Sequence, residues 1–373
     1  MAGENGIYLL SMKETKFKHT EIGLIPEDWE VKSLVDATPL QRGFDLPKAE
    51  QQIGSYPVVY SNGICSYHNK FMIKGPGVVT GRSGTIGSVH YIESDYWPHN
   101  TTLWVTKFNG NYPLYVYYLF QTIDWKLYST GSGVPTLNRN DVHEKLLPFP
   151  TYEEQSRIAT ALYDIDTLIR NLDRTIEKKK NIRQGAMEQL LSGKSDWVEC
   201  ELSEIINVVK GVQLNGSELL EDGPYPMING GIEPSGYTTN FNRNAETITI
   251  SEGGNSCGYV NFIRQKFWAG GHCYCVVIRK NVEIEKDFLY HLLKNNEKTI
   301  MAMRVGSGLP NVQSKTLLAM RVSYPLDLQE QRAIATTLTA MDDEIAVLQM
   351  ERDKYANIRS GMMDDLLSGA KRI

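Results

Sequence analysis

Apolar residues recur in alternating steps of four and three along two long stretches of the chain. In the first stretch, these positions are Ile158, Leu162, Ile165, Ile169, Leu172 and Ile176. In the second stretch, they are Ile334, Leu338, Met341, Ile345 and Leu348. This spacing is typical of the a and d seam of a coiled coil. It predicts one long helix within residues 151–195 and another within residues 326–373.

The second stretch repeats the first at a constant offset. Glu154-Gln155 returns as Glu330-Gln331, an offset of 176 residues (330 − 154), and Leu-Leu-Ser-Gly at 190–193 returns at 366–369. A fixed long period indicates two copies of one structural unit. Two matched seams in one chain can bury each other, so we expect the two helices to pair. The alternative is an amphipathic helix that packs only on its own domain.

The segments that precede the two helices are also related to each other. Trp29 and Trp197 lie 168 residues apart (197 − 29) at equivalent places near the starts of these segments. In each segment a short apolar run leads into a glycine-rich turn, at 81–87 and at 251–258. Both patterns are typical of a strand, a tight turn and a second strand.

A Gly-Ser-Gly-x-Pro turn at 131–135 recurs at 306–310, ahead of each long helix. We therefore expect an α+β fold in which two β-rich domains are joined by two long helices. The expected boundaries are an N-terminal extension at 1–16, domains at 17–150 and 196–325, and helices at 151–195 and 326–373. Shorter helical segments are expected at 115–127 and 288–303.

Composition limits the class of protein. A chain of 373 residues with 41% hydrophobic and 22% charged residues can build more than one globular core. No apolar run is long enough to span a membrane, and five scattered cysteines indicate a reducing, cytoplasmic environment. The net charge of −5 means that any contact with DNA has to come from a local basic face.

Motifs of catalysis and of cofactor binding are missing. Gly193-Lys194-Ser195 resembles the end of a phosphate-binding loop, but Glu188 stands where that loop needs a glycine. The sequence also lacks the dinucleotide, metalloprotease and serine-hydrolase motifs and the tetrapeptide of amino-methyltransferases. Cys273 and Cys275 alternate like one face of a strand, which argues against a metal site. We therefore expect no catalytic residue, metal or cofactor on this chain.

Polar residues in the loops are the remaining candidates for chemistry. Arg, Lys, Asn, Gln and Ser side chains can bind phosphates and the edges of bases. For each single residue, a solvated surface role is the alternative, and each Gly-Ser-Gly segment could be a simple turn. The candidates in the first domain are Arg42, Lys70, Arg82, Ser83, Asn100, Asn138 and Arg139. Those in the second domain are Lys210, Asn229, Asn255, Ser256, Arg304, Asn311, Gln313 and Lys315.

The order and duplication of these motifs resemble the specificity subunit of type I restriction–modification systems. The motifs are Gly-Leu-Ile-Pro-Glu-Asp-Trp at 23–29, the two Gly-Ser-Gly-x-Pro turns, Glu-Gln-x-x-Ile-Ala at the start of each long helix, and the Leu-Leu-Ser-Gly endings. The resemblance covers nearly the whole chain from residue 17. The second domain departs from the pattern, because it keeps only Asp196-Trp197 of the first motif.

The resemblance implies a function that the residues alone do not. In this family, each of two target-recognition domains reads half of a split sequence in double-stranded DNA, and an antiparallel coiled coil sets the spacer. Two modification (methyltransferase) subunits dock on the coiled coil and supply S-adenosylmethionine-dependent adenine methylation. Restriction subunits, which are motor nucleases, add ATP- and Mg-dependent translocation and cleavage. A fused restriction–methylation enzyme and a coiled-coil scaffold without a role on DNA are the alternatives.

Overall fold

The computed structural model describes residues 15–130, 135–306 and 308–373. Most of the predicted N-terminal extension and parts of both Gly-Ser-Gly turns lie outside the described residues. The chain divides into two compact units. Unit 1 comprises the chain up to Asp173 together with Glu351–Ile373, and unit 2 comprises Arg174–Met350.

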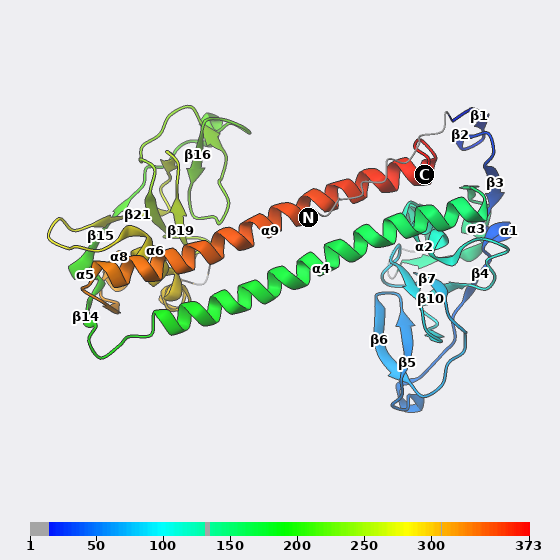
Figure 1. Cartoon of the computed structure of the whole chain (residues 1–373), viewed down its shortest axis with the longest axis horizontal. Helices are drawn as coiled ribbons and strands as arrows, with labels where there is room; N and C mark the ends of the chain where they lie inside the picture. The colour runs from blue at the N-terminus through cyan, green and yellow to red at the C-terminus, as the bar shows by residue number, and fades with distance from the viewer. Residues whose placement is uncertain (1–14, 131–134, 307) are drawn as a thin grey trace, which may run out of the picture. The chain divides into compact units, whose positions relative to one another are not determined.

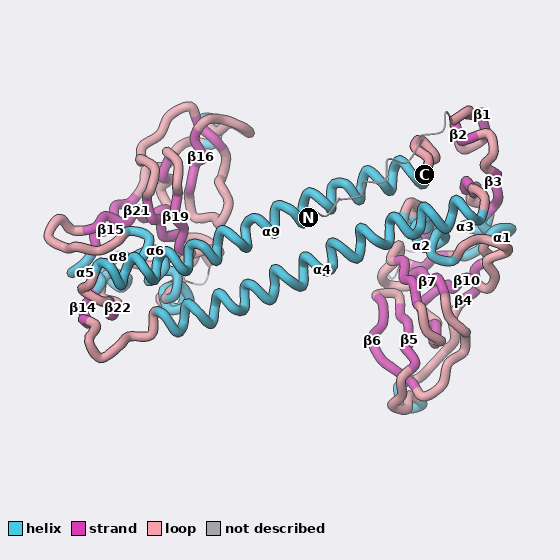
Figure 2. Tube along the Cα trace, in the orientation of Figure 1, coloured by secondary structure: helices cyan, strands magenta, loops and turns pink. Residues whose placement is uncertain are grey.

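Two long helices dominate the chain and are its longest elements (Figures 1 and 2). Helix α4 spans Tyr152–Leu190, and helix α9 spans Leu328–Ser368. The division into units cuts through both helices. Each unit therefore contains one β-rich domain, the start of the helix that follows this domain, and the end of the other helix. The two predicted long helices are confirmed.

The domain of unit 1 contains most of the strands of the chain's first half (Figure 2). Its strands are β1 (Phe17–Thr20), β2 (Gly23–Pro26), β3 (Glu30–Ser33), β4 (Leu40–Arg42), β5 (Tyr56–Tyr60), β6 (Gly63–His68), β7 (Gly77–Gly81), β8 (Val89–Ile92), β9 (Trp97–Pro98), β10 (Thr102–Val105), β11 (Ser129–Thr130), β12 (Thr136–Leu137) and β13 (Leu146–Phe149). Its helices are α1 (Leu34–Ala37), α2 (Pro113–Gln121) and α3 (Arg139–His143), with 3-10 turns at Lys48–Glu50 and Trp125–Tyr128.

The domain of unit 2 follows a closely related order. Its strands are β14 (Val198–Glu201), β15 (Ile206–Lys210), β16 (Tyr225–Ile228), β17 (Tyr237–Thr238), β18 (Thr247–Ser251), β19 (Val260–Ile263), β20 (Trp268–Ala269), β21 (Cys273–Ile278) and β22 (Arg321–Tyr324). Its helices are α5 (Leu202–Ile205), α6 (Lys286–Asn295), α7 (Glu297–Ala302) and α8 (Ser314–Leu318), with a 3-10 turn at Gly216–Glu218.

The two domains share one sheet topology. Unit 1 has a four-stranded antiparallel sheet of order β4-β10-β7-β8, and unit 2 has the matching sheet β15-β21-β18-β19. A second sheet mixes antiparallel and parallel pairing in both units, as β6-β5-β9 and as β17-β16-β20. A two-stranded ribbon precedes each long helix, formed by β3 with β13 and by β14 with β22. The predicted internal repeat and α+β class are therefore confirmed.

The shorter helices differ from the prediction at their ends. Helix α2 begins at Pro113, where a proline fits the first turn, and it ends at Gln121 rather than at residue 127. The remaining residues form the 3-10 turn at Trp125–Tyr128. In unit 2, the segment predicted at 288–303 breaks at Asn296 into α6 and α7, because Asn296 leaves the helical conformation.

The seam residues are largely removed from solvent, as a coiled coil requires. Eight of the eleven predicted seam residues are buried, and Ile169, Met341 and Leu348 are half-buried. The start of each helix also packs on its own domain. Ile158 and Leu162 belong to the core of unit 1, and Leu338 belongs to the core of unit 2. Burial of such side chains contributes about 1.5–3 kcal/mol each. Pairing of the helices and packing on the domain therefore coexist and are not alternatives.

The end of each long helix completes the core of the other helix's domain. In unit 1, Leu366 and Leu367 of α9 lie in one cluster with Trp29 and Phe149. In unit 2, Met187 of α4 lies in one cluster with Trp197 and Phe288. Within the described residues, no helix has an apolar stretch that would let it cross a bilayer.

A duplicated candidate nucleic-acid interface

Each β-rich domain is fixed to its own long helix by a glutamate and a glutamine at the helix start. In unit 1, the indole N–H of Trp29 donates to Oε2 of Glu154 at 3.1 Å. The side chain of Gln155 accepts from the backbone N–H of Tyr112, the N-cap of α2, at 2.8 Å and donates to the carbonyl of Pro150 at 2.9 Å. These contacts explain why Glu-Gln stands at this point of the sequence.

Unit 2 repeats these contacts with the equivalent residues. The indole N–H of Trp197 lies 3.4 Å from Oε1 of Glu330. Gln331 accepts from the backbone N–H of Glu285, the N-cap of α6, at 2.7 Å and donates to the carbonyl of Pro325 at 2.8 Å. Both glutamines are buried, so each side chain fixes a helix start where water cannot replace it. We call each of these two sets of contacts a joint.

Ion pairs set the direction and register of the two helices within each unit. In unit 1, Arg359 of α9 contacts Asp166 of α4 at 2.5 Å, and Arg352 contacts Asp173 at 3.1 Å. A residue further along α4 pairs with a residue that comes earlier in α9, so the two helices are antiparallel. This antiparallel pairing agrees with what the family resemblance implies.

Unit 2 has its own ion pairs between the two helices. Arg183 of α4 contacts Asp342 of α9 at 2.9 Å, and Lys179 contacts Glu344 at 2.7 Å. The residue numbers again fall on α9 as they rise on α4. The helix ends in unit 2 are therefore antiparallel as well.

The glycine-rich turn of each domain is held by the same backbone hydrogen bonds. In unit 1, the N–H of Arg82 donates to the carbonyl of Thr101 at 2.8 Å, and its carbonyl accepts from the N–H of Leu137 at 2.8 Å. The N–H of Gly84 donates to the carbonyl of Pro135 at 3.4 Å. Gly84 has a φ of +86°, which favours glycine at this place. The turn is therefore hydrogen-bonded to Pro135, the last residue of the Gly-Ser-Gly-x-Pro segment.

In unit 2, Glu252 occupies the place that Arg82 has in unit 1. Its N–H donates to the carbonyl of His272 at 2.8 Å, and its carbonyl accepts from the N–H of Val312 at 2.8 Å. The N–H of Gly254, with a φ of +89°, donates to the carbonyl of Pro310 at 3.0 Å. The two domains therefore present different side chains from one backbone scaffold.

In unit 1, the structure brings Arg42 and Asn100 together around a carboxylate. Arg42 is the last residue of β4, and its Nη2 lies 3.4 Å from Oδ1 of Asp45. The side-chain amide of Asn100 donates to the same oxygen. Ser83 forms a β-bridge with Thr136 next to Arg82. Four of the predicted residues thus lie on loops at the ends of β4, β7 and β9.

In unit 2, Lys210 is held by Glu252. Nζ of Lys210 lies 2.9 Å from Oε1 of Glu252, and Nδ1 of His272 lies 3.0 Å from Oε2. Burial opposes ionisation of Glu252, but hydrogen bonds from Lys210 and His272 outweigh it and lower the pKa of this carboxyl. Asn229 accepts from the backbone N–H of His272 at 2.8 Å and so adjoins this cluster. Lys210 and His272 are exposed, whereas the side chain of Glu252 is 13% exposed.

The other predicted residues lie farther from these clusters or serve local structure. Lys70 is exposed in the loop after β6. Asn138 caps helix α3 by accepting from the N–H of Asn140 at 3.1 Å, and Arg139 is the exposed first residue of that helix. These three residues have no contact with the Arg42 cluster in the structure.

The remaining candidates of unit 2 lie on the turn and on the segment beside it. Asn255 is exposed and Ser256 is half-buried in the glycine-rich turn, and Arg304 is exposed. Asn311 forms β-bridges with Gly253 and Val305. Gln313 is the N-cap of α8 without a side-chain capping bond, and Lys315 is exposed in that helix.

Sequence reasoning missed the acidic and histidine members of these clusters. Asp45, Glu252 and His272 were not predicted, because the candidates were chosen as donors to phosphates and bases. Asp45 stands three residues after Arg42, and this spacing is the one signal that could have indicated it. Glu252 and His272 lie 20 residues apart and meet only through the fold.

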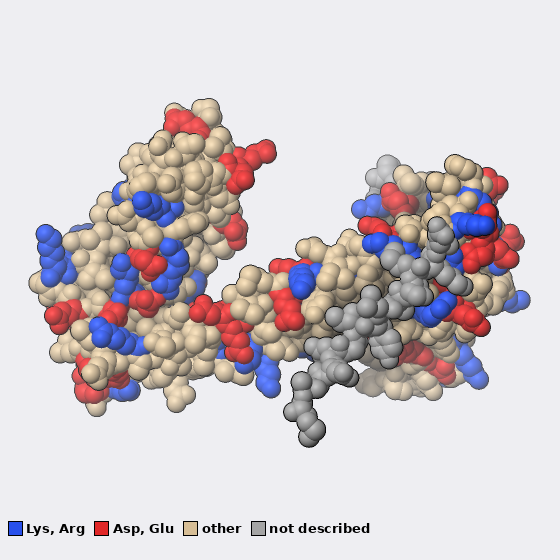
Figure 3. All heavy atoms as spheres, turned by 45° about the horizontal axis from the view of Figure 1, so that its top comes forward, with Lys and Arg blue, Asp and Glu red and all other residues tan. Residues whose placement is uncertain are grey.

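Charge is distributed in small groups rather than in one basic face. In the view of Figure 3, Lys and Arg side chains lie among Asp and Glu side chains on both units. This mixture agrees with the net charge of −5. Any contact with a polyanion therefore depends on local clusters such as those around Arg42 and Lys210.

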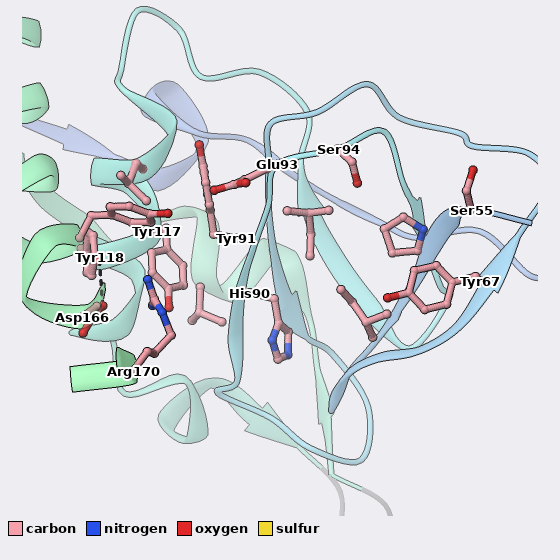
Figure 4. A pocket seen from close by; sticks show the side chains of 16 residues that line it. Ser55, Tyr67, His90, Tyr91, Glu93, Ser94, Tyr117, Tyr118, Asp166 and Arg170 are labelled. Atoms are coloured by element: carbon pink, nitrogen blue, oxygen red, sulfur yellow. Dashed lines mark hydrogen bonds between the residues drawn. The ribbon is translucent and has the colours of Figure 1, made fainter. Parts of the chain in front are cut away.

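A hollow of about 710 Å³ lies in unit 1 beside the start of α4. Figure 4 shows Tyr117, Tyr118, Asp166 and Arg170 at one end of it and Tyr67 at the other. The hydroxyl of Tyr118 donates to Oδ2 of Asp166 at 2.8 Å. Because Asp166 is also paired with Arg359, it is committed to structure rather than available as a base.

These features define a class of protein: two related β-rich domains, each bearing its own polar loop cluster, mounted on one antiparallel pair of helices. A family comparison makes the class specific. The domain described as "Type I restriction modification DNA specificity domain" matches residues 26–181 and again residues 194–354. The chain therefore belongs to this family and carries its domain twice.

Individual relatives agree with the family assignment. The MjaVIII specificity subunit of Methanocaldococcus jannaschii is 23% identical over 423 residues, covering 97% of this chain and 97% of that protein. A Mycoplasma pneumoniae protein, named provisionally as a type I specificity subunit, is 32% identical over 174 residues. That match covers 45% of this chain and 46% of the relative, so it spans about half the length of that curated protein.

A solved structure shares the fold. The crystal structure of the S subunit of a type I restriction–modification system from M. genitalium has a TM-score of 0.75 with this chain. The two are 22% identical, and the match covers 91% of this chain and 96% of that chain. This similarity concerns the fold of the domains and helices.

Proposed function

We propose that this protein is the DNA sequence-recognition subunit of a type I restriction–modification complex. Each recognition domain, at 17–150 and 196–325, reads one half of a bipartite site in double-stranded DNA. The antiparallel helices set the length of the unread spacer and dock the modification subunits. Membership of the specificity family supports a role without catalysis on this chain.

One observation carries this proposal: the two domains share a scaffold and differ in the side chains that it presents. The same three backbone hydrogen bonds hold the turn that carries Arg82 in one domain and the turn that carries Glu252 in the other. Base recognition requires this combination, because a constant backbone fixes the approach to the DNA and variable side chains select the base edges. A scaffold protein without a role on DNA gives no reason for such variation at equivalent positions.

Docking of two modification subunits is supported by a pair of equivalent exposed isoleucines. Ile182 and Ile358 are 49% and 41% exposed, and each precedes the arginine that pairs with the opposite helix. Successive residues of an α-helix point about 100° apart, so each isoleucine points to the side of its arginine, where it is exposed to solvent. Two equivalent apolar positions suit two copies of one partner protein.

Catalysis and cofactors belong to the partner subunits in this proposal. Modification subunits supply S-adenosylmethionine, and restriction subunits supply the ATP- and Mg-dependent steps. The candidate DNA-binding residues remain the loop residues predicted from sequence, and Arg42, Arg82, Ser83, Asn100, Lys210 and Asn229 are the ones that lie in or beside the two polar clusters.

The test is reconstitution of the chain with the modification subunit of its complex. The purified chain with S-adenosylmethionine and DNA should transfer no methyl group, and the assembled complex should methylate adenine at one bipartite sequence. Methyl transfer by the isolated chain would favour a fused enzyme. Assembly without salt-dependent DNA binding would favour a scaffold, because phosphate contacts make affinity fall steeply with salt.

A further inference from the structure

Residues 82 and 252 are equivalent positions with opposite hydrogen-bonding character. Each follows one of the two central strands of its four-stranded sheet, β7 or β18, and each is held by matching hydrogen bonds from its N–H and to its carbonyl. A glycine with positive φ follows two residues later in both turns, at 84 and 254. The backbone therefore delivers the two side chains to the same place in each domain.

The surroundings of the two positions are also different. Arg82 is half-buried, and its guanidinium has no ion-pair partner within residues 15–130, 135–306 and 308–373. The nearby cation Arg42 is instead occupied by Asp45. In unit 2, the equivalent cation Lys210 is drawn onto Glu252, which also accepts from His272. Unit 1 thus has the unpaired guanidinium of Arg82 at this position, and unit 2 has the carboxylate of Glu252 between Lys210 and His272.

We infer that positions 82 and 252 are a matched pair of specificity determinants that select complementary kinds of base edge in the two half-sites. This inference rests on the proposed function, since it assumes that both domains contact DNA. Arg82 offers only donors, which suit O6 and N7 of guanine in the major groove. Glu252 offers acceptors, which suit the N4 amino group of cytosine.

The carboxylate of Glu252 has the capacity for this contact. An ionised carboxylate has about four lone-pair positions, and Lys210 and His272 use one oxygen each. The positive charge of Lys210 also offsets the repulsion between Glu252 and DNA phosphates. The cluster is therefore compatible with a polyanion, whereas an isolated glutamate at the same place would oppose binding.

The test is a reciprocal set of substitutions in the full chain, assembled with its modification subunits. Arg82→Gln and Glu252→Gln each remove the charge and keep a side chain of similar reach. Methylated sites are then sequenced for every complex. We expect Arg82→Gln to relax one base of the first half-site only, and Glu252→Gln to relax one base of the second half-site only. Loss of such a contact corresponds to about 5- to 150-fold in discrimination.

A matched control removes an exposed ion pair of the same domain away from the turn. Glu199 pairs with Arg321 at 2.8 Å between β14 and β22, so Glu199→Gln should leave both half-sites unchanged. Thermal melting of each variant checks that its domain stays folded, and Glu252→Asp provides a second variant if Glu252→Gln melts early.

The possible outcomes separate this inference from the proposed function. If the wild-type complex methylates no defined sequence, the proposed function fails. If the wild-type complex is specific and both glutamine variants keep its full sequence preference, then only the role of positions 82 and 252 is wrong. If either variant alters both half-sites, the two positions act through assembly rather than by reading bases, and the inference is overturned.

Discussion

Arg183 and Asp342 form a two-point ion pair between α4 and α9. Nε of the arginine donates to Oδ1 and Nη2 donates to Oδ2, both at 2.9 Å. In unit 1, Arg359 and Asp166 are the same residues shifted by the repeat offset of 176 (359 − 183; 342 − 166), with the roles of the two helices exchanged. The helix pair thus has twofold character in its contacts as well as in its sequence.

Removal of this ion pair should destabilise unit 2 in particular. The side chain of Arg183 is only 12% exposed and that of Asp342 is 36% exposed, so the pair is partly shielded from water. Arg183→Ala would leave Asp342 without its charged partner. We expect a loss of about 1–2 kcal/mol, less than for a fully buried pair because solvent still reaches the aspartate. Differential scanning calorimetry would measure it.

An exposed pair on the same helices provides the comparison. Arg352 and Asp173 are 40% and 51% exposed, so Arg352→Ala should cost no more than about 1 kcal/mol. Combining Arg183→Asp with Asp342→Arg should recover part of the loss, since the charges again attract. An equal effect of Arg183→Ala and Arg352→Ala would mean that burial of the pair is unimportant.

Acid should weaken unit 2 through His291. Its ring is buried, Nε2 is paired with Thr339 at 2.9 Å, and Nδ1 lies 4.0 Å from Oδ2 of Asp342. Burial lowers the pKa of His291 to about 4, and Asp342 offsets only part of this effect. Since the folded-state pKa lies below the unfolded value of about 6.5, the unfolded chain takes up the proton first. Stability is therefore complete above pH 6.5 and falls as the pH approaches 4.

Between pH 7 and pH 5, protonation of His291 in the unfolded chain should lower the free energy of unfolding by about 2 kcal/mol. The equivalent contact in unit 1 is made by Tyr118, whose hydroxyl donates to Asp166. His291→Tyr copies that arrangement and should flatten the pH dependence, as should His291→Gln. Chemical denaturation at a series of pH values would show this. A wild-type profile that stays flat down to pH 5 would be incompatible with a neutral, buried His291.

The exposed isoleucines should control how many modification subunits bind. Ile182→Glu and Ile358→Glu each place a charge on one of the two proposed docking positions, so each complex should retain one modification subunit instead of the proposed two. The double variant should retain none. Native mass spectrometry would count the subunits, with Ile182→Val and Ile358→Val as controls that keep the apolar surface. Full complexes from the double glutamate variant would place the docking surface elsewhere.

Longer helices should lengthen the spacer between the half-sites. The antiparallel register places the point after Arg174 opposite the point after Met350, since Asp173 pairs with Arg352 on one side and Lys179 pairs with Glu344 on the other. One heptad inserted at both points keeps the seam in phase. Seven residues add about 10 Å, which equals about three base pairs of duplex DNA.

The added heptads would also require a rotation of roughly a third of a helical turn between the half-sites. Slower methylation of the lengthened site is therefore expected, and sequencing of methylated DNA would reveal the new spacing. Rapid methylation at the original spacing would show that the helices do not measure the spacer.

The helix pair was predictable because its signal lies within each helix. Apolar steps of four and three over several turns match the period of a helix and do not match the period of a strand, and a second copy at a fixed offset provides the partner. The degree of burial was less predictable, because the pattern does not report what else covers a seam residue. Leu162 is fully buried, since its own domain covers it too, whereas Leu348 is half-buried.

The loop clusters were only partly predictable. Arg42 and Lys210 could be identified because they are cations at equivalent positions of a repeat. Their carboxylate partners could not be identified in the same way, because Asp45 lies on the loop after β4 and Glu252 follows β18. In each domain a carboxylate lies beside the cation, but it comes from a different loop in each case. Its position therefore depends on loop conformation rather than on sequence spacing.

The joint at each helix start has a practical consequence for protein engineering. The helix contributes the Glu-Gln pair, and the domain contributes an indole, a proline carbonyl and the backbone N–H of an N-cap residue, Tyr112 in one case and Glu285 in the other. Every residue except proline can supply this backbone N–H, so the hydrogen bond to the glutamine does not depend on which side chain stands at the N-cap. A domain from another protein of this family could therefore replace either domain if it kept the tryptophan and the N-terminus of the helix that corresponds to α2 or α6.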